Sequence, residues 1–160
     1  MSEFVPVNIF PTGIPLKKDA CVVLVRTAWN EKIVGELQKG SVRILEKNNV
    51  RFHVLTVPGA FEIPFAIKKH YEQSVEKPDA YVALGCVLRG DTPHFDYVCK
   101  AVTDGILQLN LLLPVPSIFG VLTVDTETQA LERIGGKHGH KGEESAETAL
   151  AMISLFQSGV

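Results

Sequence analysis

Residues 84–97, LGCVLRGDTPHFDY, place a histidine at a point where chemistry is expected. An apolar run ends at a charged glycine turn, Thr92 and Pro93 are suited to cap and begin a helix, and His94 follows in the first helical turn. Free backbone N–H groups and the positive dipole end attract phosphate or carboxylate there and disfavour imidazolium. A neutral His94 could exchange protons near neutral pH, and a histidine that only helps to cap the helix is the equal alternative.

A second group of charged residues lies in the segment 133–142, RIGGKHGHKG. Arg133 ends a predicted short helix, and Lys137 and Lys141 follow among four glycines. Cations at this position can complement a helix C-terminus. They can also hold a phosphate, because glycine lets the backbone come close to a ligand. The Walker pattern GxxxxGK[ST] is absent, so this is not a nucleotide-binding loop of that type.

Two further residues stand at the ends of other predicted strands. Trp29 could stack on a flat ring, and packing in the core is the equal alternative. Glu62 follows Pro58-Gly59-Ala60-Phe61 near the first turn of a predicted helix, where acidic residues are common for dipole reasons alone. Together the residues favour a cleft that binds a phosphate and a flat ring beside a proton-exchanging histidine, and they do not identify the reaction.

The remaining metal- and thiol-type residues favour no site. His138 and His140 are two residues apart on a loop with no further ligand nearby, so no metal site is expected. Cys21 and Cys86 lie inside apolar runs, where a free cysteine usually behaves as a small hydrophobic residue.

The elements that must position these residues alternate regularly between strands and helices. The strands are predicted over 20–28, 50–57, 80–88 and 115–123, and the helices over 31–47, 61–73, 93–113, 126–134 and 143–157. Asn30 is placed to cap the first helix, and Pro64 must lie in the first turn of the second. This order predicts βαβ units and a parallel sheet with helices on both faces.

The carboxyl ends of the predicted strands carry most of the candidate residues. Ligands of open parallel sheets bind outside these ends. In this chain the ends are Trp29-Asn30, Pro58-Gly59-Ala60 and Leu88 to Thr92, so the opening stretch lies where a site is expected.

Length and composition limit the class of protein. The 160 residues suit a single domain spanning 1–160, with 46% hydrophobic residues and a net charge of -2. No basic stripe appears, so no nucleic-acid partner is expected. No apolar stretch reaches the roughly 18 residues of a membrane span. Three cysteines, no CxxC pattern and no secretory leader predict a reducing compartment, the cytoplasm.

The N-terminal arm, residues 1–12, does not fit the alternating scheme. Residues 4–10 alternate in a strand-like way without an obvious partner in their own sheet. The segment is a loose edge strand, an arm that pairs with a neighbouring subunit, or a frayed terminus.

Taken together, several segments resemble the lumazine synthase family. They are TAWN (27–30), VPGAFEIP (57–64), ALGCVLRGDTPHFDYV (83–98), FGVLT (119–123), DTETQALERIGGK (125–137) and HKGEESAETALAMI (140–153). They follow the family order and cover almost the whole chain after residue 20, which makes the resemblance specific.

The resemblance implies a reaction without a cofactor in riboflavin biosynthesis. A ribitylamino-substituted aminouracil condenses with 3,4-dihydroxy-2-butanone 4-phosphate to give 6,7-dimethyl-8-ribityllumazine, phosphate and water. The implied fold is a flavodoxin-like three-layer αβα sandwich with a four-stranded parallel sheet. The implied assembly is a pentamer with sites between neighbouring subunits, and in many members a hollow shell of 60 subunits. Riboflavin synthase is a further expected partner.

The resemblance also implies roles for individual residues. Those expected at the pyrimidine and its ribityl chain are Trp29, Ala60, Phe61, Glu62, Cys86, Val87, Leu88 and Phe119. Trp29 stands where most members have Phe, Cys86 to Leu88 are expected to act through the backbone, and Phe119 is expected to come from the neighbouring subunit.

A second set of roles concerns the phosphate and the protons. Asp91, Thr92, Arg133 and Lys141 are expected beside the phosphate, with Arg133 as the main cation. His94 is expected to transfer protons with Glu144 as its acidic partner. The role of His140, which stands where Asn is common, stays open.

Two rival functions remain at this stage. One is a non-catalytic flavin-binding or shell-forming protein on the same fold, and the other is a flavodoxin-like redox protein with a bound flavin. The choice between pentamer and shell, and the subunit that supplies Arg133, also stay open.

Overall fold

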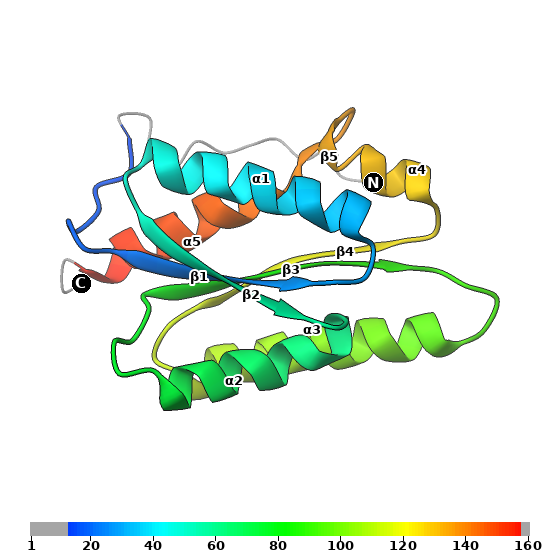
Figure 1. Ribbon diagram of the computed structural model, residues 1–160, viewed down its shortest axis with the longest axis horizontal. Helices are drawn as coiled ribbons and strands as arrows, with labels where there is room; N and C mark the ends of the chain where they lie inside the picture. The colour runs from blue at the N-terminus through cyan, green and yellow to red at the C-terminus, as the bar shows by residue number, and fades with distance from the viewer. Residues whose placement is uncertain (1–12, 158–160) are drawn as a thin grey trace.

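The structure is built on a parallel sheet of four strands in the order β2-β1-β3-β4. A computed structural model describes residues 13–157. The strands are β1 (Cys21–Thr27), β2 (Arg51–Val57), β3 (Ala80–Leu88) and β4 (Ser117–Val124). Helices α1 (Glu31–Lys47) and α5 (Lys141–Gln157) cover one face, and α2 (Ile63–Gln73) and α3 (His94–Leu112) cover the other (Figure 1). The predicted flavodoxin-like three-layer αβα sandwich is confirmed.

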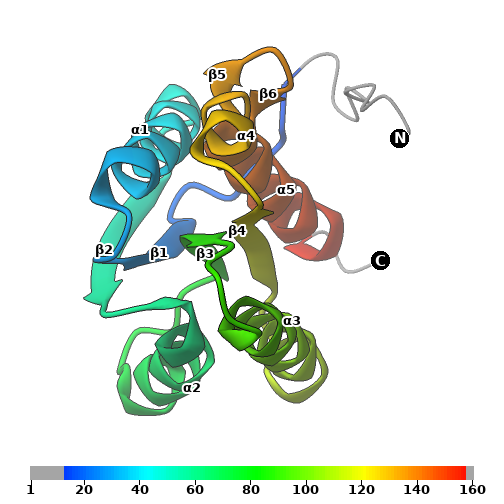
Figure 2. The same ribbon diagram turned by 90° about the vertical axis from the view of Figure 1, so that its right-hand side faces the viewer.

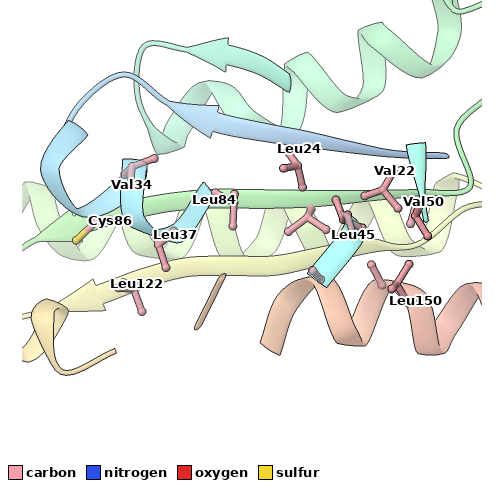
Figure 3. Packing of buried hydrophobic residues seen from close by; sticks show 14 of the residues in the cluster. Val22, Leu24, Val34, Leu37, Leu45, Val50, Leu84, Cys86, Leu122 and Leu150 are labelled. Atoms are coloured by element: carbon pink, nitrogen blue, oxygen red, sulfur yellow. The ribbon is translucent and has the colours of Figure 1, made fainter. Parts of the chain in front are cut away.

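Each face of the sheet carries its own apolar core. Successive side chains of a strand point to opposite faces. Strand β1 therefore gives Val22 and Leu24 to the core under α1 and α5, and Val23 and Val25 to the core under α2 and α3. Figure 3 shows the first of these cores, where side chains of the sheet meet those of both helices. Burial on both faces explains why β1 reads as a continuous apolar run in the sequence.

The predicted elements differ from the observed ones mainly at their ends. Helix α1 and strand β3 have the predicted bounds, whereas the helix predicted over 61–73 begins as a 3₁₀ turn, η1 (Ala60–Glu62), before α2. Pro64 lies in the first turn of α2, as expected. The helix predicted over 126–134 is shorter, because α4 (Glu127–Leu131) gives way to a strand that the sequence analysis missed.

That missed strand belongs to a small hairpin in the glycine-rich segment. Strands β5 (Ile134–Gly136) and β6 (Gly139–His140) pair in an antiparallel way. Gly135 and Gly139 adopt positive φ values of 103° and 82°, which side chains with a Cβ rarely adopt. Strands of three and two residues are too short to show an alternating pattern, so only the glycines signalled the turn.

The start of α3 also differs from the prediction. The helix begins at His94, Pro93 takes the preceding position with a helical backbone, and no side chain caps this end. Thr92 therefore does not act as the predicted cap, and His94 is the first residue of the helix. The ring still lies in the first helical turn, where free backbone N–H groups gather.

The two edges of the sheet are β2 and β4. Within residues 13–157, β2 pairs with β1 alone and β4 with β3 alone. The side chains of β2 are partly or fully exposed along its whole length. The predicted arm, residues 1–12, lies outside the described residues, so its pairing stays a prediction.

Candidate active site

The predicted site residues other than Phe119 form two groups, one at the carboxyl ends of β1, β2 and β3 and one in the hairpin beside α1 and α5. The strand-end cluster follows β1, β2 and β3 and consists of Trp29, Ala60, Phe61, Glu62, Cys86, Val87, Leu88, Asp91, Thr92 and His94. The hairpin cluster lies around β5, β6 and the start of α5 and consists of Arg133, Lys141 and Glu144. In Figure 2 the hairpin lies beside α1, α4 and α5, whereas α2 and α3 lie across the sheet from it.

The loop after β1 holds Trp29 by backbone hydrogen bonds. The N–H of Trp29 donates to the carbonyl of Pro58 at 3.2 Å, and the Thr27 hydroxyl donates to the carbonyl of Trp29 at 3.1 Å. Asn30 has left-handed dihedral angles, and its Nδ2 donates to the carbonyl of Cys86 at 2.7 Å. Asn30 therefore precedes α1 as predicted, but its side chain binds the end of β3 and does not cap the helix.

The turn after β2 is shaped by Gly59 and Glu62. The N–H of Gly59 donates to Oε2 of Glu62 at 3.0 Å, which closes the turn that carries Ala60 and Phe61. A Cβ at Gly59 would lie 2.7 Å from ring carbons of Trp29, so the indole lies directly against this glycine. Trp29 and Phe61 are exposed over 67% and 62% of their residue surface. Two aromatic side chains from adjacent strand ends are thus presented to solvent, where a flat ligand can stack on them.

At the end of β3, a ligand is expected to meet the backbone more than the side chains. The Cys86 side chain is buried in the core under α1 and α5 (Figure 3), and burial raises its thiol pKa to about 11. The thiol is therefore neutral and is not a nucleophile. Val87 is half-buried and Leu88 is exposed, so the chain surfaces at this point.

His94 follows a loop that Arg89 braces. Arg89 Nε donates to Asp125 at 2.6 Å, and its guanidinium lies 4.2 Å from the centre of the Phe95 ring. Asp91, Thr92 and His94 are exposed. Among residues 13–157, no hydrogen bond reaches the His94 ring, so it is free to meet a ligand at the start of α3.

The hairpin cluster is held by an ion pair between two chain segments. Arg133 Nη1 and Nη2 donate to the two carboxylate oxygens of Glu144 at 3.0 and 2.9 Å. The two side chains are only 22% and 16% exposed. Arg133 also donates to the carbonyl of His138 and accepts at its own carbonyl from the N–H of Lys141 at 2.7 Å. The planar guanidinium is therefore fixed before any ligand arrives.

Lys141 gives this cluster a second cation. Burial lowers the pKa of Lys141, the Glu144 carboxylate opposes that shift, and the Arg133 guanidinium adds to it. A half-buried ammonium between a cation and a carboxylate gains from an added anion, because the anion offsets the positive charge.

Within one chain, Glu144 makes no hydrogen bond to His94. Both oxygens of Glu144 are bound to Arg133 on the α1 and α5 side of the sheet, whereas His94 begins α3 on the other side. Phe119 lies half-buried in the edge strand β4 and packs toward α2 and α3. The partnership of Glu144 with His94 therefore stays a prediction for neighbouring subunits.

Residues 13–157 lack the features of two other protein classes. No group of three or more His, Cys, Asp or Glu side chains gathers there in a metal-binding arrangement. The helices in this part of the chain lack the length and apolar character needed to cross a membrane. His138 is exposed, whereas His140 is buried, so the two histidines differ in environment.

Comparisons with known proteins agree with this geometry. The family model described as 6,7-dimethyl-8-ribityllumazine synthase matches residues 19–157. The chain belongs to the 6,7-dimethyl-8-ribityllumazine synthase family. Proteins of that name from Porphyromonas gingivalis and Parabacteroides distasonis are 48% and 44% identical to it over 146 residues. These alignments cover 89% of this chain in both cases, and 89% and 90% of the two relatives.

The lumazine synthase resemblance did not single out every residue that shapes the clusters. Asn30 was expected as a cap and instead ties the Trp29 loop to β3. Gly59 was expected only to end a strand, yet it leaves room for the indole. The signal for both was their position directly after a strand, where turn residues often serve the site.

Proposed function

We propose that this chain catalyses the formation of 6,7-dimethyl-8-ribityllumazine. Its substrates are a ribitylamino-substituted aminouracil and 3,4-dihydroxy-2-butanone 4-phosphate, and its other products are phosphate and water. The observation that carries the proposal is the match between two clusters and two substrates. Exposed aromatic side chains suit the flat pyrimidine, and the fixed Arg133 with Lys141 suits the phosphate.

His94 is proposed to move protons during the reaction. Imine formation, loss of phosphate and loss of water each need a proton to be transferred. The exposed His94 ring lies in the first turn of α3 and makes no hydrogen bond within residues 13–157, so it is available to a bound substrate as a general acid or base. Holding two reactants side by side supplies a large further part of the rate.

Arg133 is proposed to orient the phosphate. The ion pair with Glu144 already fixes the Arg133 guanidinium, so little side-chain conformational entropy is lost when an anion binds. Asp91 and Thr92 lie at the start of α3 and are proposed to border the same anion.

We infer that the site is shared between subunits of a pentamer. Within one chain Glu144 is bound to Arg133 beside α1 and α5, whereas His94 begins α3 across the sheet, which supports a site completed by a neighbour's Arg133, Lys141 and Phe119. Among the described residues, α3 presents an exposed apolar surface; its residues are Tyr97, Leu107, Leu111 and Leu112. The compact hairpin segment is the length expected of members that form shells of 60 subunits, with riboflavin synthase as a proposed partner.

The assembly is tested by light scattering of the intact chain. A pentamer or a shell is expected at micromolar concentration, and a monomer would contradict the shared site. Deletion of residues 1–10 should weaken the pentamer if this arm adds a strand to a neighbour's sheet.

The activity is tested by mixing the two substrates with purified protein and following lumazine fluorescence. Formation of the lumazine at a rate that depends on protein concentration is expected. Absence of product from a folded, assembled sample would favour the non-catalytic flavin-binding or shell-forming alternative.

A cytoplasmic location is proposed from the three free cysteines.

A further inference from the structure

His140 lies at the junction of β6 and α5 and caps that helix. Its side chain is buried, with 8% of the residue exposed. The N–H of Glu143, in the first turn of α5, donates to Nδ1 of the ring at 3.3 Å. Nδ1 must be unprotonated to accept this bond, so the ring performs as a neutral base the task that Ser, Asp or Asn performs at other helix starts.

The other side of the same ring lies against α1. A Cβ at Gly40 would stand 2.1 to 2.9 Å from Cε1, Nδ1 and Nε2 of His140, so the ring occupies the space that this glycine leaves. Nearby, the hydroxyl of Ser41 donates to the carbonyl of Gly142 at 2.8 Å. The start of α5 is thus seated on α1, and the His140 ring fills the space between them.

The turn that His140 caps is the one that carries the hairpin cluster. His140 pairs with Ile134 across the hairpin, one residue after Arg133. Lys141 follows directly, and Glu144 lies one turn along α5. A change at His140 therefore moves the backbone from which both the carboxylate and the second cation project.

Nearby charges shift the pKa of the His140 ring in both directions. Glu143 of α5 and Glu36 of α1 favour the protonated ring, and Arg43 of α1 disfavours it. Arg43 is itself paired with Glu143, at 2.8 Å between Nη2 and Oε1. Burial is the largest effect and lowers the pKa of His140 below its ordinary value of 6.5. The ring is therefore neutral at pH 7 and able to cap the helix.

We propose that His140 is a positioning residue for the phosphate site: its neutral ring caps α5, fills the space at Gly40, and so sets the Arg133–Glu144 pair. The inference rests on the proposed function, because it assigns phosphate binding to that pair. A residue that only stabilised the core would affect both substrates alike, whereas a positioning residue here affects the phosphate substrate.

The first test compares His140→Ala, His140→Asn and a matched control, His70→Ala. His70 is a half-buried histidine, hydrogen-bonded to Tyr81 at 2.7 Å and placed on α2, away from the hairpin. The Michaelis constant for the butanone phosphate should rise about 2- to 30-fold in His140→Ala, the range expected for a lost helix cap. The constant for the pyrimidine should stay unchanged, as should both constants in His70→Ala.

His140→Asn should recover most of the loss, because the Asn oxygen can accept the same N–H. Equal changes for both substrates, or no change in His140→Ala, would overturn the proposal. So would the same change in His70→Ala.

A second test uses Gly40→Ala, which alters no polar group. The added methyl group should push the ring out of place and raise the constant for the butanone phosphate. In the double variant with His140→Ala the space is free, so Gly40→Ala should add nothing further. Independent, additive effects would show that the ring and the glycine do not act together.

Binding of inorganic phosphate, measured by calorimetry, separates this inference from the proposed function. If the wild-type protein makes no lumazine, the proposed function fails. Phosphate affinity still tests His140: weaker binding in His140→Ala with recovery in His140→Asn supports the inference. Equal affinity in the wild type and His140→Ala contradicts it.

Discussion

The two clusters reach their geometry in different ways. In the strand-end cluster, the exposed side chains of Trp29 and Phe61 are positioned by backbone hydrogen bonds and by a glycine that makes room. In the hairpin cluster, the largely buried Arg133 and Glu144 are positioned by each other. Exposed aromatic side chains are positioned here by the turns that carry them, whereas the Arg133 guanidinium is positioned by an ion-pair partner. This difference predicts that the two clusters fail differently when mutated.

The largest effect is expected for His94→Ala. The first-turn imidazole is the only group of the strand-end cluster proposed to move protons, so the turnover rate should fall about 10²- to 10⁴-fold. The Michaelis constants should change much less. Single-turnover lumazine fluorescence on a variant with an unchanged unfolding temperature checks this, and an unchanged rate would remove His94 from the chemistry.

Gly59→Ala tests whether the backbone positions Trp29. The new methyl group must displace the indole, because its carbon would lie 2.7 Å from the ring. Misplacement of a stacking group can cost up to about 10²-fold in catalytic efficiency. The pyrimidine should bind more weakly, with little effect on the butanone phosphate.

The fluorescence of Trp29, the only tryptophan, reports the same change directly. A pyrimidine analogue should quench it in the wild type and less in Gly59→Ala. Identical quenching curves would mean that the indole does not contact the ligand.

Arg133→Lys tests the ion-paired cluster with a smaller expected effect. The lysine keeps the charge but loses the fork that binds Glu144 through two nitrogens. The Michaelis constant for the butanone phosphate should rise about tenfold, the value of one hydrogen bond to a charged group. If the constant for the pyrimidine rises equally, Arg133 serves folding or assembly.

The smallest effect concerns stability against acid. The folded-state pKa of His140 is lowered by burial, so the unfolded chain binds the extra proton more readily as the pH falls below 6.5. The stabilisation from the neutral ring is complete above 6.5 and is lost as the pH falls through the lower folded-state pKa. Urea unfolding should show a smaller loss of stability between pH 7 and pH 5 in His140→Asn than in the wild type. Equal slopes would contradict a buried neutral ring.

The fold was predictable from the sequence because its signals are local and repeated. The apolar run of 80–88 coincides with β3, and the helical spacing of 31–47 coincides with α1. The hairpin β5–β6 was not predictable, because strands this short leave no period to detect.

The sequence predicted which residues belong to the site better than it predicted which of them contact one another. The candidates that follow β1, β2 and β3 lie where parallel sheets bind ligands. The Arg133–Glu144 pair joins residues 11 apart through the hairpin, and the contact of Gly40 with His140 spans 100 positions. Contacts of this kind depend on how α1 and α5 pack, which no single stretch of sequence records.

The contact between Gly142 of α5 and Leu37 of α1 has a consequence for how the chain tolerates variation. A Cβ at Gly142 would lie 2.0 Å from the carbonyl oxygen of Leu37, so backbone meets backbone at this point. Every other amino acid would force the two helices apart. In a saturation library, codons for glycine alone should survive selection at position 142. Thr148, exposed on the same helix, should accept most replacements that favour a helix.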